Sequence, residues 1–272
     1  MNEQRRHAGL VGSIGPAWLV AVAVLVATFS APAAKAADIR VMISGGLSAA
    51  YKELVPQFEK MTGNKVTTSF GPSMGNTENA IPIRLARGEP ADVLIMVGDA
   101  LSVMISKGYA DSASRVDLVR SPIGMVVRAG APKPDISTPE ALKATLLGAK
   151  SVAYSDSASG VYVGTELFKR LGIASEMEGK ARMIPADPVA GVVARGDAEL
   201  GFQQISELLP VAGAELVGAL PPELQKITIF SAALTKDTKE REQAKALIDF
   251  LASPAAAPVL VKSGMEPIAP QR

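Results

Sequence analysis

Apolar and polar residues follow one another along the chain in short segments whose spacing predicts strands followed by helices. The segments 39–43, 66–70 and 91–97 are mainly apolar or β-branched, as expected of strands, and 91–97 is apolar enough to be covered on both faces. Further strands are predicted at 121–128, 152–154, 200–203 and 227–234, and helices after Thr138, at 187–194, from Asp237 and after Ser253-Pro254. Strands and helices therefore alternate, which predicts an α/β fold with mainly parallel sheets.

The first part of the chain has the features of a signal peptide. Arg5 and Arg6 precede an apolar run at 17–29, and Ala34-Lys35-Ala36 has the small-x-small pattern of a signal-peptidase site. The apolar run is shorter than the roughly 20 residues that span a bilayer, which disfavours the alternative of an uncleaved anchor. We expect residues 1–36 to be removed and the mature chain, 37–272, to reside in the periplasm.

Composition then excludes several classes of site in the mature chain. The single histidine, His7, lies in the leader, and the sequence has no cysteine. A Ser-His-Asp triad, a Cys-His pair and an imidazole or thiolate metal site are therefore impossible. With 28 basic and 27 acidic residues, the chain also has no basic stripe for nucleic acid. We expect a monomeric binding protein without turnover, cofactor or metal.

Turns rich in serine and glycine follow three of the predicted strands and precede helical segments. They lie at 44–48, 69–76 and 155–160, and Asp156 is their one charged residue. In open α/β sheets, ligands collect outside the carboxyl ends of strands. Hydroxyls, amides and helix N-termini favour an anion there. Asp156 disfavours a fully ionised anion if it faces the ligand, and its structural alternative is an N-cap.

The order of these features resembles the periplasmic molybdate-binding proteins and the wider group of type II solute-binding proteins of ABC importers. The resemblance covers essentially the whole mature chain and rests on Ser44-Gly45-Gly46-Leu47-Ser48, Phe70-Gly71-Pro72-Ser73, Gly88-Glu89-Pro90-Ala91-Asp92-Val93-Leu94-Ile95, Ala158-Ser159-Gly160-Val161-Tyr162 and Arg195-Gly196-Asp197-Ala198-Glu199-Leu200-Gly201-Phe202. It implies one lobe from 37–120 and 235–272, a second from 121–234, and two hinge crossovers near 121–128 and 227–234. It also implies that a small anion closes the lobes and that the closed form docks on a membrane permease.

The resemblance also implies where the ligand binds. The expected contacts are Ser44, Gly45, Gly46, Ser73, Met74, Ser159, Gly160 and Gln204. Gly46 stands where the family usually has a hydroxyl residue, and Gln204 stands where it has a tyrosine. We expect Gly46 to widen one wall and Gln204 to add a hydrogen-bond acceptor. Both changes favour a small organic acid, although a molybdate- or tungstate-like oxyanion stays open.

Other functions are compatible with single features of the sequence. Gly71-Pro72-Ser73-Met74-Gly75 fits the G-x-S-x-G elbow of a secreted serine hydrolase, whose base would have to be a lysine or a carboxylate. A carbohydrate-binding protein needs more aromatic platforms than this chain offers. The effector domain of a transcription regulator shares the bilobal plan but has no use for an export signal.

Overall fold

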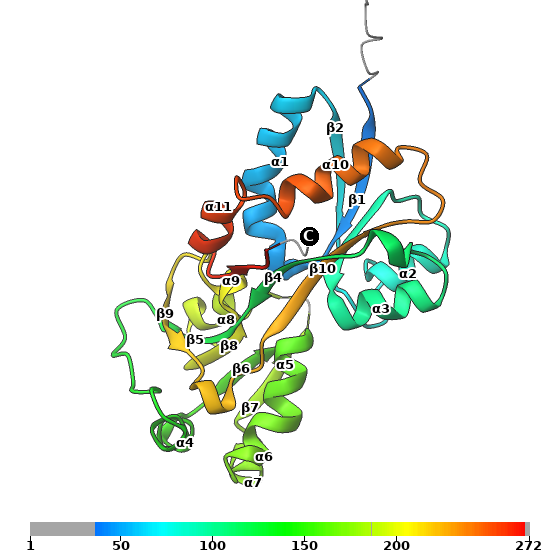
Figure 1. The fold of residues 1–272 in the computed structure, drawn as a ribbon. Coiled ribbons are helices and arrows are strands. Elements are labelled where there is room, and N and C mark those ends of the chain that lie inside the picture. Colours follow the sequence, from blue (N-terminus) through cyan, green and yellow to red (C-terminus); the bar gives the residue numbers. More distant parts are fainter. Residues whose placement is uncertain (1–35, 186, 270–272) are drawn as a thin grey trace, which may run out of the picture. The chain divides into compact units, whose positions relative to one another are not determined.

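The computed structural model describes residues 36–185 and 187–269, and nearly all of the predicted signal peptide lies outside these ranges. Within them, no helix is both long and apolar enough to cross a membrane. The strands form two sheets (Figure 1). The first has the order β11 (Glu266–Pro267), β4 (Val116–Ser121), β10 (Thr228–Leu234), β3 (Val93–Val97), β1 (Asp38–Ile43) and β2 (Lys65–Phe70).

Helices cover both faces of the first sheet because its central strands are apolar on both sides. Val93 and Ile95 pack with α1 (Ser48–Thr62), α10 (Arg241–Leu251) and α11 (Ala257–Lys262). Leu94 and Met96 point to the opposite face and pack with α2 (Ile81–Ala86) and α3 (Gly98–Ser106). Alternate residues of β3 therefore contribute to two different cores. The sequence prediction of a doubly covered strand is confirmed.

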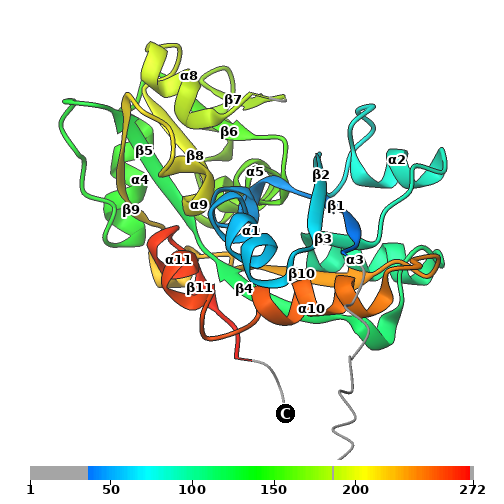
Figure 2. The same ribbon diagram turned by 90° about the horizontal axis from the view of Figure 1, so that it is seen from above.

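Helices also cover both faces of the second sheet (Figure 2). Its order is β7 (Ala181–Ile184), β6 (Val152–Ser155), β8 (Leu200–Gln204), β5 (Ile123–Arg128) and β9 (Ala214–Ala219). Ile123, Met125 and Val127 share one core with residues from 136–177, whereas Val126 faces α8 and α9. The helices on this sheet are α4 (Pro139–Gly148), α5 (Ala158–Tyr162), α6 (Phe168–Arg170), α7 (Ala174–Met177), α8 (Val189–Arg195) and α9 (Ile205–Leu208).

The chain passes between the two sheets at two places. The first passage is Pro122, between β4 and β5, and the second joins β9 to β10. Gln225 fastens the two passages to each other, because its side chain accepts from the Ile123 N–H and donates to the Ile123 carbonyl, both at 2.9 Å. The Gln225 amide thus bonds the backbone of Ile123 as a neighbouring strand would. The two hinge crossovers expected from the sequence are present.

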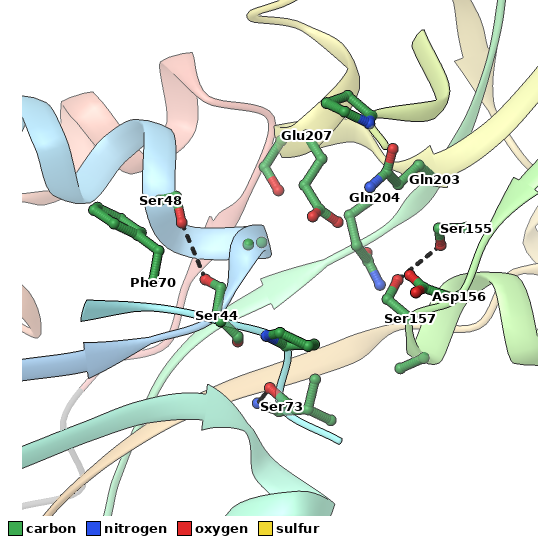
Figure 3. A pocket seen from close by; sticks show the side chains of 18 of the residues that line it. Ser44, Ser48, Phe70, Ser73, Ser155, Asp156, Ser157, Gln203, Gln204 and Glu207 are labelled. Carbon is green, nitrogen blue, oxygen red and sulfur yellow. Dashed lines mark hydrogen bonds between the residues drawn. The ribbon is translucent and has the colours of Figure 1, made fainter. Parts of the chain in front are cut away.

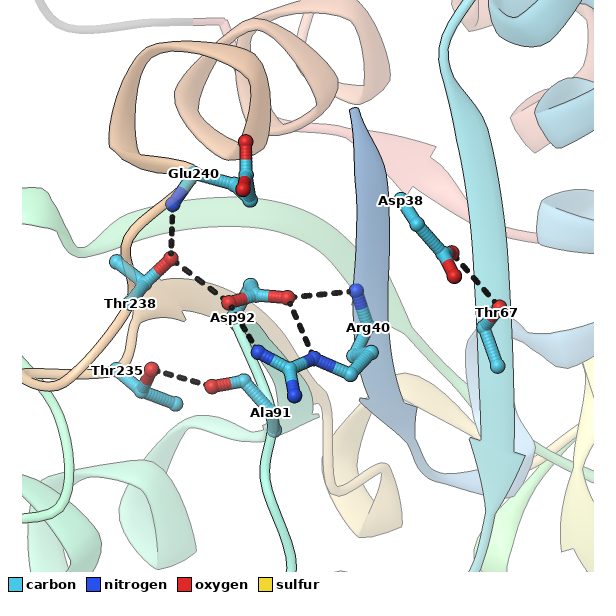
Figure 4. Close-up of polar contacts among 8 residues, drawn as sticks. All are labelled: Asp38, Arg40, Thr67, Ala91, Asp92, Thr235, Thr238 and Glu240. Atoms are coloured by element: carbon cyan, nitrogen blue, oxygen red, sulfur yellow. Dashed lines mark hydrogen bonds and ion pairs between the residues drawn. The ribbon is translucent and has the colours of Figure 1, made fainter. Parts of the chain in front are cut away.

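A buried carboxylate ties three segments of the first sheet together (Figure 4). Asp92 is fully buried and accepts from the Arg40 backbone N–H at 2.8 Å and from the Arg40 guanidinium at 3.1 Å. The Thr238 hydroxyl donates to its other oxygen at 2.9 Å. Burial by itself raises the pKa of Asp92, but the hydrogen bonds from Arg40 and Thr238 outweigh it and hold the pKa below its ordinary value. This network explains the aspartate of the 88–95 motif as a structural residue.

Several expectations about the elements were wrong. Both sheets are mixed, because β10 runs antiparallel to β3 and β4 and β5 runs antiparallel to β8 and β9. The penultimate helix begins at Arg241 instead of Asp237, since Thr238 is bonded to Asp92 and to the Glu240 N–H. The last helix begins at Ala257, beyond Ser253-Pro254. The sequence analysis also did not predict the strands β4, β7, β9 and β11, since its strand at 121–128 corresponds to β5.

Candidate functional site

A cleft of about 610 Å³ lies at the carboxyl ends of four strands from both sheets. Its walls come from the turns that follow β1, β2, β6 and β8, which is where ligands bind in open α/β sheets. The volume falls within the usual range of small-molecule sites.

Six of the eight predicted contact residues line this cleft. They are Ser44, Gly45, Gly46, Ser73, Met74 and Gln204. Ser159 and Gly160 lie behind its wall, where they are buried against β6. A side chain at Gly160 would place its Cβ 1.6 Å from the Ser155 carbonyl oxygen, so this glycine serves close packing of α5. Ser155, Asp156, Ser157 and Ala158 line the cleft in their place.

Ser73 does not stand on a nucleophile elbow. The β2 strand ends at Phe70, and no helix begins until α2 at Ile81, so the expected turn from strand directly into helix is absent. The Ser73 hydroxyl accepts from the Val97 backbone N–H at 2.9 Å, and among the described residues no lysine or carboxylate is hydrogen-bonded to it. The geometry therefore gives no support to the hydrolase alternative.

Gly46 does not widen the cleft, contrary to expectation. A Cβ at this position would lie 2.1 Å from the Phe230 Cζ atom, so the ring of Phe230 already fills the space that a side chain would need. Phe230 is buried in the core under α1 and also lines the cleft. The absence of a hydroxyl at Gly46 is therefore explained by aromatic packing.

Gln204 is engaged by the hinge rather than facing the cleft freely. Its amide oxygen accepts from the Thr228 hydroxyl at 2.7 Å when its nitrogen donates to the Ser121 hydroxyl and carbonyl, both at 2.9 Å. Ser121 ends β4 and Thr228 begins β10, so this buried side chain joins the two crossover strands. These bonds explain why Gln204 is held at the hinge, and its acceptor role toward a ligand stays a prediction.

The turn after β6 carries a cluster of hydroxyls, of which those of Ser155 and Ser157 belong to the cleft lining. Ser155 lies 2.7 Å from Ser157 and 3.2 Å from Ser159, measured between hydroxyl oxygens. The N-cap of α5 is Ser157, so the expected N-cap role of Asp156 was wrong. Asp156 instead lines the cleft beside these hydroxyls (Figure 3).

Glu207 is the functional candidate that the sequence analysis missed. It lies on α9, and its Oε1 atom packs so tightly on Gly45 that a Cβ there would come within 2.2 Å of it. Burial raises the pKa of Glu207 to about 7; a hydrogen bond from the Gln203 side chain opposes the rise and the charge of Asp156 adds to it. Figure 3 shows this carboxyl projecting into the cleft from the α9 side, opposite Ser44. The cleft thus holds a carboxyl group whose pKa is raised toward neutral pH by burial.

Gln203 holds a fixed orientation next to this carboxyl. Its Oε1 accepts from the Val189 backbone N–H at 3.2 Å, which directs the amide nitrogen away from α8 and toward Glu207. Both residues lie outside the three Ser/Gly turns, so the sequence analysis did not predict them. A carboxylate placed just beyond the end of a buried strand, as Glu207 is, was the signal available.

Acidic side chains outnumber basic ones among the described residues that line the cleft, with Asp156, Asp187 and Glu207 against Lys52. Lys52 of α1 is the one cationic side chain among the described lining residues, and its ammonium lies 4.9 Å from the centre of the Phe70 ring. Asp187, another lining residue, is paired with Arg195 at 2.7 Å. Lys52 is therefore the side chain among the described lining residues that could pair ionically with an anion, alongside the hydroxyls and amides of the turns.

Comparison with known proteins agrees with the fold and the position of the cleft. A family model described as bacterial extracellular solute-binding protein matches residues 39–266. The chain belongs to this family. The relatives of the chain include proteins named for binding and one named for catalysis.

The relatives of this solute-binding protein fall into these two groups. It is 51% identical over 233 residues to a protein named aconitate isomerase from a Pseudomonas species, covering 86% of this chain and 89% of that protein. It is 28% identical to the molybdate-binding protein ModA of Azotobacter vinelandii, covering 89% of this chain and 95% of that one. The solved structure of the Azotobacter vinelandii periplasmic molybdate-binding protein superposes with a TM-score of 0.67 at 21% identity, over 86% of this chain and 100% of that one. The type II binding-protein fold expected from the sequence is confirmed.

Proposed function

We propose that this protein is an exported isomerase that interconverts cis- and trans-aconitate in a solute-binding cleft. The observation that carries the proposal is the Glu207 carboxyl, which projects into the cleft with a pKa raised to about 7. The ionised form of this carboxyl repels an anionic ligand, so catalysis explains its position in the cleft better than capture alone does. The 51% identity to a protein named aconitate isomerase supports this specific reaction.

The chemistry requires a single base and no cofactor. Aconitate is a propene with a carboxylate on every carbon, and its saturated outer carbon is both allylic and next to a carboxylate. A base breaks a C–H bond at this carbon, and the electron pair spreads over the allylic system and the carboxylates. A proton then returns from the base to the other outer carbon, the double bond moves to the other arm, and the composition is unchanged.

Glu207 meets the requirements of this base. A general base is most effective when its pKa lies near the working pH, and a carboxyl with a pKa of about 7 can both accept and return the proton. Its contact with Gly45 places it beside the turn after β1, where the backbone lacks a side chain. The absence of histidine and cysteine from the mature chain argued against enzymes, but it does not bear on a carboxylate base.

The remaining groups of the cleft suit a polycarboxylate. The turn at the start of α1 and the serines 155 and 157 offer hydrogen-bond donors, and Lys52 offers the positive charge. Such donors bind ionised carboxylates more strongly than neutral groups. The small organic acid that the sequence analysis favoured is therefore retained, although the two departures on which it rested have structural explanations.

The direct test is to incubate the purified mature protein with trans-aconitate in deuterated buffer and follow the reaction by proton NMR. We expect cis-aconitate to appear and deuterium to enter the outer carbons of both isomers. If trans-aconitate binds but neither isomer conversion nor deuterium exchange exceeds that of buffer, the isomerase proposal fails.

That negative outcome would favour a second candidate, a binding protein that captures a small carboxylate or oxyanion and delivers it to an ABC transporter permease. Membership of the solute-binding family favours it. In both cases we propose export through a signal peptide at 1–36 and closure of two lobes, 37–120 with 235–272 and 121–234, over the ligand.

Lys52 allows a prediction about the charge of the substrate. Exchange of Lys52 for Gln is expected to raise the KM for aconitate about threefold to fivefold at low ionic strength, because an exposed ion pair contributes modestly. The difference should shrink as salt is added, since exposed charges are screened. Steady-state kinetics at two salt concentrations checks this, with Lys60→Gln on the same helix as the control. Equal salt dependence of Lys52→Gln and the unmodified protein would contradict an ionic role.

A further inference from the structure

Two serine hydroxyls beside the Glu207 contact are buried without a hydrogen-bond partner. Ser44 is 3% exposed and Ser206 is 2% exposed, and within the described part of the chain neither hydroxyl oxygen has a partner. A buried polar group without a partner is destabilising, so native proteins keep few of them, and each calls for an explanation.

Their positions relate them to one site. Ser44 follows β1 and precedes Gly45, whereas Ser206 lies on α9 and precedes Glu207. Because the Glu207 carboxyl packs on Gly45, the two hydroxyls flank the point where opposite walls of the cleft meet. Both serines line the cleft, and a serine hydroxyl can turn among three staggered rotamers to reach a group inside it.

Other buried serines show that this condition is specific to the cleft. Ser231 is fully buried in the first sheet, and its hydroxyl donates to Asp117 at 2.6 Å. Ser121, also fully buried, receives the Gln204 amide. The fold therefore satisfies serine hydroxyls away from the Gly45–Glu207 contact and leaves two unsatisfied next to it.

We propose that the Ser44 and Ser206 hydroxyls are kept free of protein partners to donate to a carboxylate of the substrate beside Glu207. This rests on the proposed function only in naming aconitate as the ligand. Ser44 was expected near the ligand from the sequence, but Ser206 was not. Ser206 directly precedes the base on the short helix α9, so its hydrogen bond would hold the substrate carboxylate in a fixed position relative to the Glu207 carboxyl.

The test separates binding from stability and from turnover. Calorimetric titration of trans-aconitate uses the Glu207→Gln protein, in which the substrate is not consumed, with Ser206→Ala or Ser44→Ala added. Each serine change is expected to weaken binding about tenfold to a hundredfold, as for a hydrogen bond to a charged group. The melting temperature of the ligand-free protein should stay the same or rise by about 2–4 °C, because an unsatisfied hydroxyl is removed.

Ser231→Ala serves as the matched control, since its hydroxyl is bonded inside the protein and lies outside the cleft lining. It should lower the melting temperature and leave aconitate affinity unchanged. Aconitate affinity that is unchanged in both Ser44→Ala and Ser206→Ala would overturn this inference alone. Affinity that depends on both serines in a protein without isomerase activity would uphold the inference and refute the isomerase.

Discussion

Replacement of Glu207 by Gln is expected to lower the rate of aconitate isomerisation by about a hundredfold to ten-thousandfold, the usual contribution of a positioned general base. Gln has nearly the same shape as Glu, so the contact with Gly45 is kept and the protein should fold normally. Aconitate should bind to this variant at least as tightly, because a negative charge has been removed from the cleft. Comparison of kcat with the calorimetric Kd measures both effects.

The same proposal predicts the pH dependence of the unmodified protein. The base must be ionised, so kcat/KM should rise with pH and level off above a pKa of about 7 in the free protein. The matched control is Glu215→Gln, which changes an acidic residue of β9 that is paired with Lys133 and does not line the cleft. It should keep the rate and the profile. A Glu207→Gln variant with a rate within threefold of the unmodified protein would refute the assignment of the base.

Replacement of Asp92 by Ala is expected to lower the free energy of unfolding by about 2 kcal/mol, because several hydrogen bonds to a buried carboxylate are lost while the half-exposed Arg40 side chain can turn to water. The change leaves the Arg40 guanidinium, the Arg40 backbone N–H and the Thr238 hydroxyl without their acceptor. Urea unfolding followed by circular dichroism measures it. The control is Asp38→Ala. Asp38 lies on β1, as Arg40 does, and accepts an exposed hydrogen bond from the Thr67 hydroxyl of β2, so its loss should lower the free energy of unfolding by less than about 1 kcal/mol.

Asp92 also predicts how stability depends on pH. Its pKa in the folded protein lies below the unfolded value of about 4, so the folded state binds fewer protons at that carboxyl. The stabilisation is present above pH 4 and is lost as the pH falls through the lower folded pKa. The difference between the unmodified protein and Asp92→Asn should therefore shrink at acid pH. A difference that stays constant from neutral to acid pH would contradict the role of the ionised form.

The sequence by itself was sufficient to predict the α/β fold, the doubly covered β3 strand and three turns that together supply about half of the residues lining the cleft. These features depend on local spacing: alternate residues of a strand face opposite sides, and serine and glycine after a strand favour a turn whatever the distant chain does. The buried stripe of Ala244, Leu247, Ile248 and Leu251 on α10 was predictable for the same reason. The start of α10 was not, because Thr238 bonds to Asp92, far away in the sequence.

The tertiary structure alone decided what each cleft residue does. Gly46 and Gln204 looked like changes in the ligand site, yet the Phe230 ring fills the space at the first and the hinge engages the second. The ordinary pKa of a glutamate gives no hint that the packing of α9 on the β1 turn desolvates Glu207. Contacts between segments distant in the sequence decide how far a side chain is buried and which hydrogen bonds it makes. Burial and hydrogen bonds together determine its pKa, and so its charge. The local sequence pattern therefore predicted where the cleft lies. Only the folded structure placed in it a carboxyl group whose pKa is close to neutral pH.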